Sequence, residues 1–328
     1  MRRREFITLM SGAAAAWPLT VRAQQAAVPV IGFLSSASRH VDDVRRLPGF
    51  RQGLHETGYT EGRNVAIEYR GADDQIDRLP ALAADLARRQ VSLIAAVGSP
   101  TSALAAKSAT TTIPIVFLNA ADPVKIGLVA SLNRPGGNVT GVTELGADLG
   151  AKRLGLLREL VPSATSIAVL VNPNRPGVDA QVAQAQQAAQ AVGLQVHILE
   201  ASSERDFDTA FLTLVKLRAG ALVISADALF NNHDDRIIAL ARRYSIPTIY
   251  EWREAVAAGG LISYGTELSY VYRQNGILAG RILKGEKPSD LPVLQATKFE
   301  TVINLRTAKA LGLTIPPGVL AIADEVIE

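Results

Sequence analysis

Short polar side chains follow the apolar segments of this sequence, one group after another. Their oxygen atoms could form hydrogen bonds with a small ligand, and free backbone N–H groups at the start of a helix could bind a carboxylate. The acids among them could accept from a ligand amine, and the aromatic rings could form an apolar wall. These candidate ligand-binding residues are Ser35, Ser36, Ser99, Thr101, Asp122, Asn172, Asp227, Tyr250, Glu251 and Tyr264.

Each of these side chains also has a simple structural role. Ser, Asn and Asp are common at helix N-termini and in turns, where their oxygens accept hydrogen bonds from backbone N–H groups. For any single residue that role is the better explanation. The ligand-binding interpretation depends on the recurrence of such residues at strand after strand in both halves of the chain, because ligands bind at the carboxyl ends of strands in open α/β sheets.

No combination of residues matches a catalytic or cofactor-binding motif. Gly98-Ser99-Pro100 follows an apolar segment but lacks the Gly-x-Ser-x-Gly pattern of a nucleophile elbow. The glycine-rich phosphate and dinucleotide motifs are absent, the four histidines are not spaced as metal-ligand pairs, and there is no cysteine. We therefore expect a binding protein, not an enzyme, with no metal and no cofactor. A secreted α/β enzyme is the alternative.

The charge of the chain is concentrated at its N-terminus. The formal net charge is +3, and four arginines with one glutamate lie in residues 1–23. This leaves 30 basic and 30 acidic side chains in the rest of the chain. Residues 24–328 are neutral overall and lack the excess of positive charge that would attract nucleic acid or an anionic membrane, so we expect neither as a partner.

Residues 1–23 have the three-part layout of an export signal. A basic start precedes a mildly apolar stretch of about 14 residues, which is too short to span a bilayer, and Val21-Arg22-Ala23 resembles a cleavage site. Arg3-Arg4-Glu5-Phe6-Ile7 resembles the twin-arginine motif, and an ordinary secretory signal is the alternative. We expect cleavage near Ala23 and a periplasmic protein.

The remaining chain alternates apolar segments of strand length with helical patterns. This alternation predicts parallel sheets covered by helices on both faces. The pattern restarts after the loop at 133–138, and 328 residues are enough for two domains. We therefore expect two similar lobes, although an eight-stranded α/β barrel gives the same alternation. The predicted strands include residues 28–34, 91–97, 113–118, 166–171, 221–225 and 246–250.

Several short motifs resemble a family of ABC-transporter substrate-binding proteins, in the branch of the tryptophan/tyrosine-type binding proteins. The resemblance covers nearly all of residues 28–328. The motifs that carry it are Pro114-Ile115-Val116-Phe117 with Asp122-Pro123-Val124, Arg134-Pro135-Gly136-Gly137-Asn138, Gly58-Tyr59-Thr60-Glu61-Gly62, Ser263-Tyr264-Gly265, Lys298-Phe299-Glu300 and Thr307-Ala308-Lys309-Ala310-Leu311-Gly312.

The resemblance implies an α/β fold of two similar doubly wound parallel-sheet lobes joined by a crossing-strand hinge, like the type I periplasmic binding proteins. The implied first lobe is residues 24–142 plus about 265–292, and the second is 143–264 plus about 293–328. The implied function is the extracytoplasmic binding component of an ABC importer. It would be a monomer that captures a small amino acid or carboxylate, possibly aromatic, and presents it to an inner-membrane permease.

The family's ligand loops would fall on Ser35-Ser36, Ser99-Pro100-Thr101, Asp122, Asn172 and Asp227. Asp227 matches the acid that binds the ligand amine, whereas Asp122 is expected to serve mainly the turn at Pro123. Asp227-Ala228-Leu229-Phe230 differs from the Thr-Asp-Asn form of the aromatic amino-acid binders, so the ligand class stays open. A ligand-sensing regulator with the same fold is another alternative, but it would need a DNA-binding segment where the export signal lies.

Overall fold

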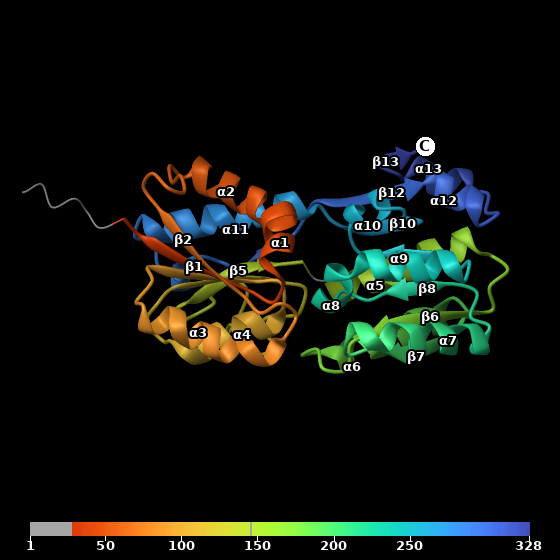
Figure 1. The fold of residues 1–328 in the computed structure, drawn as a ribbon, viewed down its shortest axis with the longest axis horizontal. Helices are drawn as coiled ribbons and strands as arrows, with labels where there is room; N and C mark the ends of the chain where they lie inside the picture. The colour runs from red at the N-terminus through yellow and green to blue at the C-terminus, as the bar shows by residue number, and fades with distance from the viewer. Residues whose placement is uncertain (1–27, 145) are drawn as a thin grey trace, which may run out of the picture.

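A computed structural model describes residues 28–144 and 146–328, which form two α/β lobes side by side (Figure 1). The predicted export signal lies outside the described residues. Each lobe is built on its own sheet, so the chain forms two lobes and not a barrel. In the part of the chain that is described, no helix combines the length and the apolar character needed to cross a membrane.

The first lobe contains a six-stranded sheet in the order β11-β5-β4-β3-β1-β2, and every neighbouring pair is parallel. Its strands are β1 (Val30–Ser35), β2 (Ala66–Gly71), β3 (Leu93–Val97), β4 (Ile115–Asn119), β5 (Val139–Thr143) and β11 (Leu294–Gln295). Its main helices are α1 (Arg39–Val41), α2 (Leu47–Glu56), α3 (Leu79–Arg88), α4 (Pro100–Ala109) and α11 (Leu268–Leu283).

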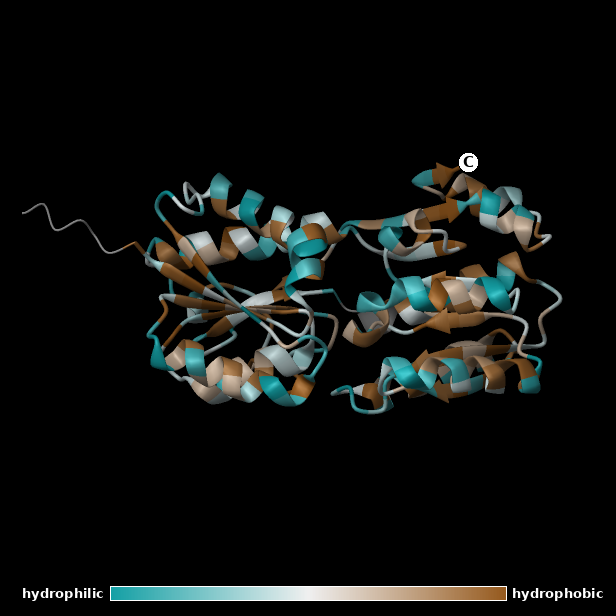
Figure 2. Cartoon of the chain, viewed as in Figure 1, coloured by the Kyte–Doolittle hydropathy of each residue, from teal (hydrophilic) through white to brown (hydrophobic). Residues whose placement is uncertain are grey.

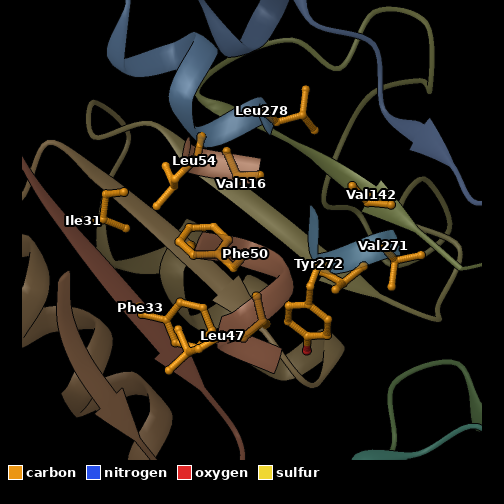
Figure 3. Close-up of a cluster of buried hydrophobic side chains, with 14 of the residues drawn as sticks. Ile31, Phe33, Leu47, Phe50, Leu54, Val116, Val142, Val271, Tyr272 and Leu278 are labelled. Atoms are coloured by element: carbon orange, nitrogen blue, oxygen red, sulfur yellow. The ribbon is translucent and has the colours of Figure 1, made fainter. Parts of the chain in front are cut away.

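Helices cover both faces of this sheet, which explains its nearly continuous apolar strands. α2 and α11 pack on one face, where Phe33 of β1 meets Phe50 with ring centroids 5.4 Å apart (Figure 3). α3 and α4 cover the other face. The strands in Figure 2 are accordingly largely hydrophobic, while the helices also carry hydrophilic residues.

α2 and α11 approach each other closely because glycines lie at their contact. A Cβ atom at Gly53 would lie 2.0 Å from the carbonyl oxygen of Arg273, and one at Gly276 would lie 2.1 Å from that of Phe50. The neighbouring Asn275 is fully buried and donates from Nδ2 to the Phe117 carbonyl of β4 at 2.8 Å. α11 is thereby fixed both to α2 and to the sheet.

The helical path before α2 begins earlier than the sequence suggests. Pro48 lies in the first turn of α2, as expected from its missing N–H. However, a π-helical turn over Asp42–Arg46 joins α1 directly to α2. This turn brings the arginines before Pro48 to the edge of the lobe.

The second lobe contains a seven-stranded sheet in the order β13-β12-β10-β9-β8-β6-β7. Only the β10–β12 pair is antiparallel among these described strands. The strands are β6 (Ser166–Val171), β7 (Gln195–Glu200), β8 (Leu222–Ile224), β9 (Thr248–Tyr250), β10 (Ile262–Thr266), β12 (Phe299–Asn304) and β13 (Glu325–Ile327). The helices are α5 (Gly146–Leu160), α6 (Val178–Ala191), α7 (Phe207–Leu217), α8 (Ala228–Asn232), α9 (Asp234–Arg243), α10 (Arg253–Ala257), α12 (Leu305–Ala310) and α13 (Pro317–Ala321).

The chain crosses between the lobes three times. It passes from β5 to α5, returns from β10 to α11, and passes again from β11 to β12. β11 pairs with β5 of the first sheet, so the last crossing follows Gln295, two residues after the expected boundary at 293. The second crossing lies at Glu267, between β10 and α11. Three short connections of this kind let two lobes rotate about a narrow hinge.

Candidate functional site

The candidate site lies where the carboxyl ends of the two sheets face each other. In the first sheet β1 has β2 on one side and β3 on the other, so the strand order reverses at β1. In the second sheet β6 lies in the same way between β7 and β8, and the order reverses at β6. Ligands of open α/β sheets bind outside the strand ends at such switch points. Two switch points, one per lobe, therefore position the loops after β1, β3, β6 and β8.

An inner cavity of about 30 Å³ lies between the lobes. The first lobe contributes residues after β3 and β4, together with Glu144 and Tyr272, and the second contributes loops after β6, β8 and β9. The polar residues lining it are Asn119, Glu144, Arg175, Asp227, Asn231 and Glu251. Its walls also include Pro100, Leu118, Trp252 and Tyr272.

A larger outer cavity of about 240 Å³ adjoins the inner one and shares Pro100, Arg175 and Asp227 with it. Ser99, Thr101 and Asn172 line this outer cavity, as do the apolar side chains of Ile76, Pro176 and Leu229. Such a shape can hold a small polar head group inside and a longer apolar or mixed group outside.

Two acidic side chains meet at the inner end of the site. Glu251 is buried with Arg153, 3.4 Å from its Nη2 atom, and accepts from Asn231 Nδ2 at 2.6 Å. Glu144 is also buried, and Thr266 Oγ1 donates to it at 3.3 Å. Burial, together with the Glu251 carboxylate, raises the pKa of Glu144 to about 8. The carboxyl of Glu144 is therefore mostly protonated at neutral pH when the cavity holds no cation.

Asp227 lies at the boundary of the two cavities. Its Oδ1 atom accepts from Leu229 N at 2.9 Å, which caps α8, and from Asn172 Nδ2 at 3.1 Å. Its Oδ2 atom lies 3.8 Å from Arg175 Nε. Burial raises the pKa of Asp227, and the Asn172 hydrogen bond and Arg175 partly oppose that rise. Asp227 thus combines a capping role with a carboxylate on the site.

Five of the ten candidate residues line the cavities between the lobes, and two more lie at the end of β1. Ser99, Thr101, Asn172 and Asp227 line the outer cavity, and Glu251 lines the inner one. Ser35 lies beside them at the end of β1, where its hydroxyl donates to Asp42 at 3.0 Å and accepts from Arg46 at 3.2 Å. Ser36 follows it, and its buried Oγ has no partner among the described residues.

Three candidates lie away from both cavities. Asp122 is exposed and accepts from Val124 N at 3.0 Å, the turn role expected of it. Tyr250 is buried within the second lobe, where its ring packs against Gly260. Tyr264 stacks on Phe299 with centroids 6.3 Å apart. Neither tyrosine lines the inner or the outer cavity, because successive strand side chains point to opposite faces of the sheet.

Several cavity residues lie outside the ten sequence candidates, and four of these lie at or just after the end of a strand. They are Asn119, Glu144, Arg175 and Trp252. Asn119 ends β4, Glu144 follows β5, Arg175 lies in the turn after β6, and Trp252 follows β9. The strand-end rule that selected the other residues applies equally to these four.

Contacts at the rim of the cavities also join the lobes. Arg45 of the first lobe binds Asp234 of the second through two hydrogen bonds of 2.8 and 3.0 Å. Arg46 donates to Asn232 Oδ1 at 2.7 Å. His233 Nε2 lies 3.3 Å from Asp74 Oδ2 of the first lobe, and this contact raises the pKa of His233. These pairs hold the lobes together around the site.

Comparison with known proteins places this arrangement in a family. Residues 27–327 match the model of the family described as ABC transporter substrate binding protein. The chain is 31% identical over 266 residues to a tyrosine-binding protein of Clostridioides difficile (strain R20291), covering 81% of this chain and 76% of that one.

Solved structures agree with this placement. An ABC domain from Streptococcus pneumonia in complex with L-Trp is similar with a TM-score of 0.83 and 26% identity, over 91% of this chain and 99% of that one. The ligand-free, open structure of a substrate binding protein with adhesive properties from Clostridium difficile is similar with a TM-score of 0.65 and 27% identity, over 92% of this chain and 99% of that one. The fold is that of the type I periplasmic binding proteins. The chain therefore belongs to the ABC transporter substrate binding protein family.

Proposed function

We propose that this protein is the extracytoplasmic binding component of an ABC importer and captures a small amino acid between its lobes. The single observation that carries this proposal is the pair of adjoining cavities between the lobes, lined from both sides by acids, a guanidinium group and apolar side chains. A zwitterionic head group needs both a cation and an acid around it, and burial makes each of those interactions stronger.

Similarity to the relatives supports an aromatic amino acid as the ligand. Trp252, Tyr272 and Pro100 give the inner cavity apolar walls, and the outer cavity continues from it. The TM-score is higher for the L-Trp complex than for the open, ligand-free relative, although the two sequence identities are nearly equal. This difference supports a closed arrangement of the lobes, with the head group inside and the side chain toward the outer cavity.

A thermal-shift screen of L-amino acids on residues 24–328 tests the proposal. A ligand at 100 times its dissociation constant should stabilise the protein by about 2.7 kcal/mol. The bound compound should be recovered chemically unchanged, since we propose binding without turnover. A screen in which only non-amino carboxylic acids bind would reject an amino-acid ligand, and a changed compound would favour an enzyme.

Export is a separate part of the proposal. We propose that residues 1–23 direct the chain through the twin-arginine route to the periplasm, where a monomer serves an inner-membrane permease. Changing Arg3 and Arg4 to Lys should leave a cytoplasmic precursor, and the parent should be cleaved before Gln24. Normal export of the double variant would indicate the general secretory route instead.

A further inference from the structure

Three residues that line the inner cavity each have a buried nitrogen atom without a hydrogen-bond partner among the described residues. These atoms are Asn119 Nδ2, Arg175 Nη2 and Trp252 Nε1. All three carry hydrogen atoms and can act only as donors. A buried donor without a partner costs roughly 1–3 kcal/mol. Three of them around one cavity point to an occupant that accepts hydrogen bonds.

Arg175 supplies the charge in this group. Its side chain is only 4% exposed, and its nearest acid, Asp227, lies 3.8 Å from Nε, which is beyond hydrogen-bond distance. Burial lowers the pKa of the Arg175 guanidinium, and Asp227 only partly offsets this effect. An arginine remains protonated even so, and therefore its cation is incompletely compensated in the absence of a ligand.

Asn119 and Trp252 have fixed donor orientations. Asn119 Oδ1 accepts from Ala121 N at 2.9 Å, so its amide nitrogen is the atom left for a ligand. Turning the amide over would place an N–H group against the N–H of Ala121. The Trp252 indole has no acceptor atom, so its ring nitrogen can only donate. Asn119 belongs to the first lobe, whereas Arg175 and Trp252 belong to the second.

We infer that Asn119, Arg175 and Trp252 together bind the carboxylate group of the ligand and bridge the lobes through it. This inference rests on the proposed function and names the groups that select its ligand. A carboxylate offers two oxygens with about four acceptor positions, which is enough for three donors. Its single negative charge compensates Arg175.

Other occupants match the cavity less well. A cation without an acceptor would leave all three donors unpaired. A dianion such as inorganic phosphate would carry two negative charges into a cavity that three acids line, Glu144, Asp227 and Glu251. Water can fill a space of about 30 Å³ in the unliganded protein but brings no charge to Arg175.

Isothermal titration with matched probes tests the inference. The probes are L-tyrosine and L-tryptophan, and tyramine and tryptamine as the corresponding amines without the carboxylate. The parent should bind the amino acids at least about a hundredfold more tightly than the amines. Arg175→Gln should lose about a hundredfold in affinity for the amino acids and only a few-fold for the amines.

Conservative variants separate a direct role from a structural one. Arg175→Lys keeps the charge without the planar fork and should fall between the parent and Arg175→Gln. Asn119→Ala and Trp252→Phe should each lose about tenfold. Arg236→Gln, which removes an exposed pair with Asp208, is the matched control and should bind like the parent. Trp252→Phe should melt near the parent in the absence of ligand, because its Nε1 atom has no partner to lose among the described residues. Asn119→Ala also removes the Oδ1 acceptor of Ala121 N, so its melting temperature should be lower.

The possible results distinguish this inference from the proposed function. If the parent binds an amino acid and Arg175→Gln binds it within threefold, the inference is overturned and the proposed function stands. The same holds if the parent binds the amines as tightly as the amino acids. A parent that binds none of the four probes rejects the proposed aromatic amino-acid ligand and the inference with it.

Discussion

The centre and the rim of the interlobe interface differ in how well their polar groups are paired. At the rim, Arg45 and Asp234 form a bidentate pair, and Arg46 and Asn232 form a hydrogen bond of 2.7 Å. At the centre, Arg175 Nη2 is unpaired, and Glu144 lacks a cation within ion-pair distance among the described residues. Both regions join the same two lobes.

This difference indicates a division of roles. The Arg45–Asp234 pair at the rim is complete without a ligand, so it joins the lobes whatever the cavity holds. The central groups are buried and incomplete, so the ligand itself must supply their partners. Because unpaired buried groups are costly whereas partly exposed pairs are screened by water, selectivity should reside at the centre. The relative placement of the lobes should depend on the contacts at the rim.

The largest expected effect concerns the partner of the ligand ammonium at the centre. The sequence favours Asp227, and this stays a prediction. The geometry adds Glu144, whose carboxyl has the Thr266 hydroxyl as its only hydrogen-bond partner among the described residues, whereas Asp227 already caps α8 and faces Arg175. We expect Glu144→Gln to lose about a hundredfold in affinity for the amino acid and Asp227→Asn about tenfold, as measured by titration calorimetry. The reverse ranking would assign the ammonium to Asp227.

A second prediction concerns the stability of the unliganded protein against pH. The pKa of Glu144 rises from an ordinary 4.5 to about 8 on folding. The folded state therefore holds a proton that the unfolded state releases, and stability falls as pH rises between these values. The slope from Glu144 is at most about 1.4 kcal/mol per pH unit. In Glu144→Gln the midpoint of chemical denaturation should change less with pH between pH 6 and pH 8 than it does in the parent.

The control for this prediction is an acid outside the interface. Glu286 forms an exposed pair with Arg281, and its replacement by Gln should leave the slope unchanged. Parallel curves for the parent and Glu144→Gln would show that Glu144 ionises normally in the folded protein. The charge of Glu144 would then already be compensated, and the centre would no longer differ from the rim in how well its polar groups are paired.

A smaller effect is expected at the rim from the Arg45–Asp234 pair. The Arg45 side chain is 23% exposed and that of Asp234 is 8%, so water weakens but does not abolish their attraction. Arg45→Gln and Asp234→Asn should each weaken ligand binding about three- to tenfold, by making closure less favourable. The double variant should lose little more than either single one, since both remove the same contact. Fully additive losses would contradict a shared contact.

The smallest effect is expected from His233. The contact with Asp74 of the other lobe raises the pKa of His233 in the closed protein, while Glu204 lies in the same lobe as His233. Protonation therefore favours closure: its contribution is present below about pH 6.5 and fades as pH rises through the closed-state pKa. Affinity should fall a few-fold across this range, and less in His233→Gln. Identical pH profiles of ligand affinity in the parent and in His233→Gln would show that His233 does not contribute to the rim contacts.

Local sequence patterns were enough to predict the strands and helices and the sheet edges where ligand-binding residues would lie. Its apolar segments place the strands, and the short polar residues after them mark the carboxyl ends, because side-chain chemistry is local. Its motifs also indicated the family and two lobes. Five of the ten candidates accordingly line the interlobe cavities, and the strand-end rule also covers Arg175 and Glu144.

Which of these residues meet in space depends on long-range packing. Glu251 and Arg153 are 98 positions apart, and Asn119 and Arg175 belong to different lobes. Tyr250 and Tyr264 lie on strands of the second sheet yet contact the interior of that lobe and not the cavities. Strand register, side-chain direction and the relative placement of the lobes fix such distances. These quantities depend on long-range packing, which no local pattern of residues encodes.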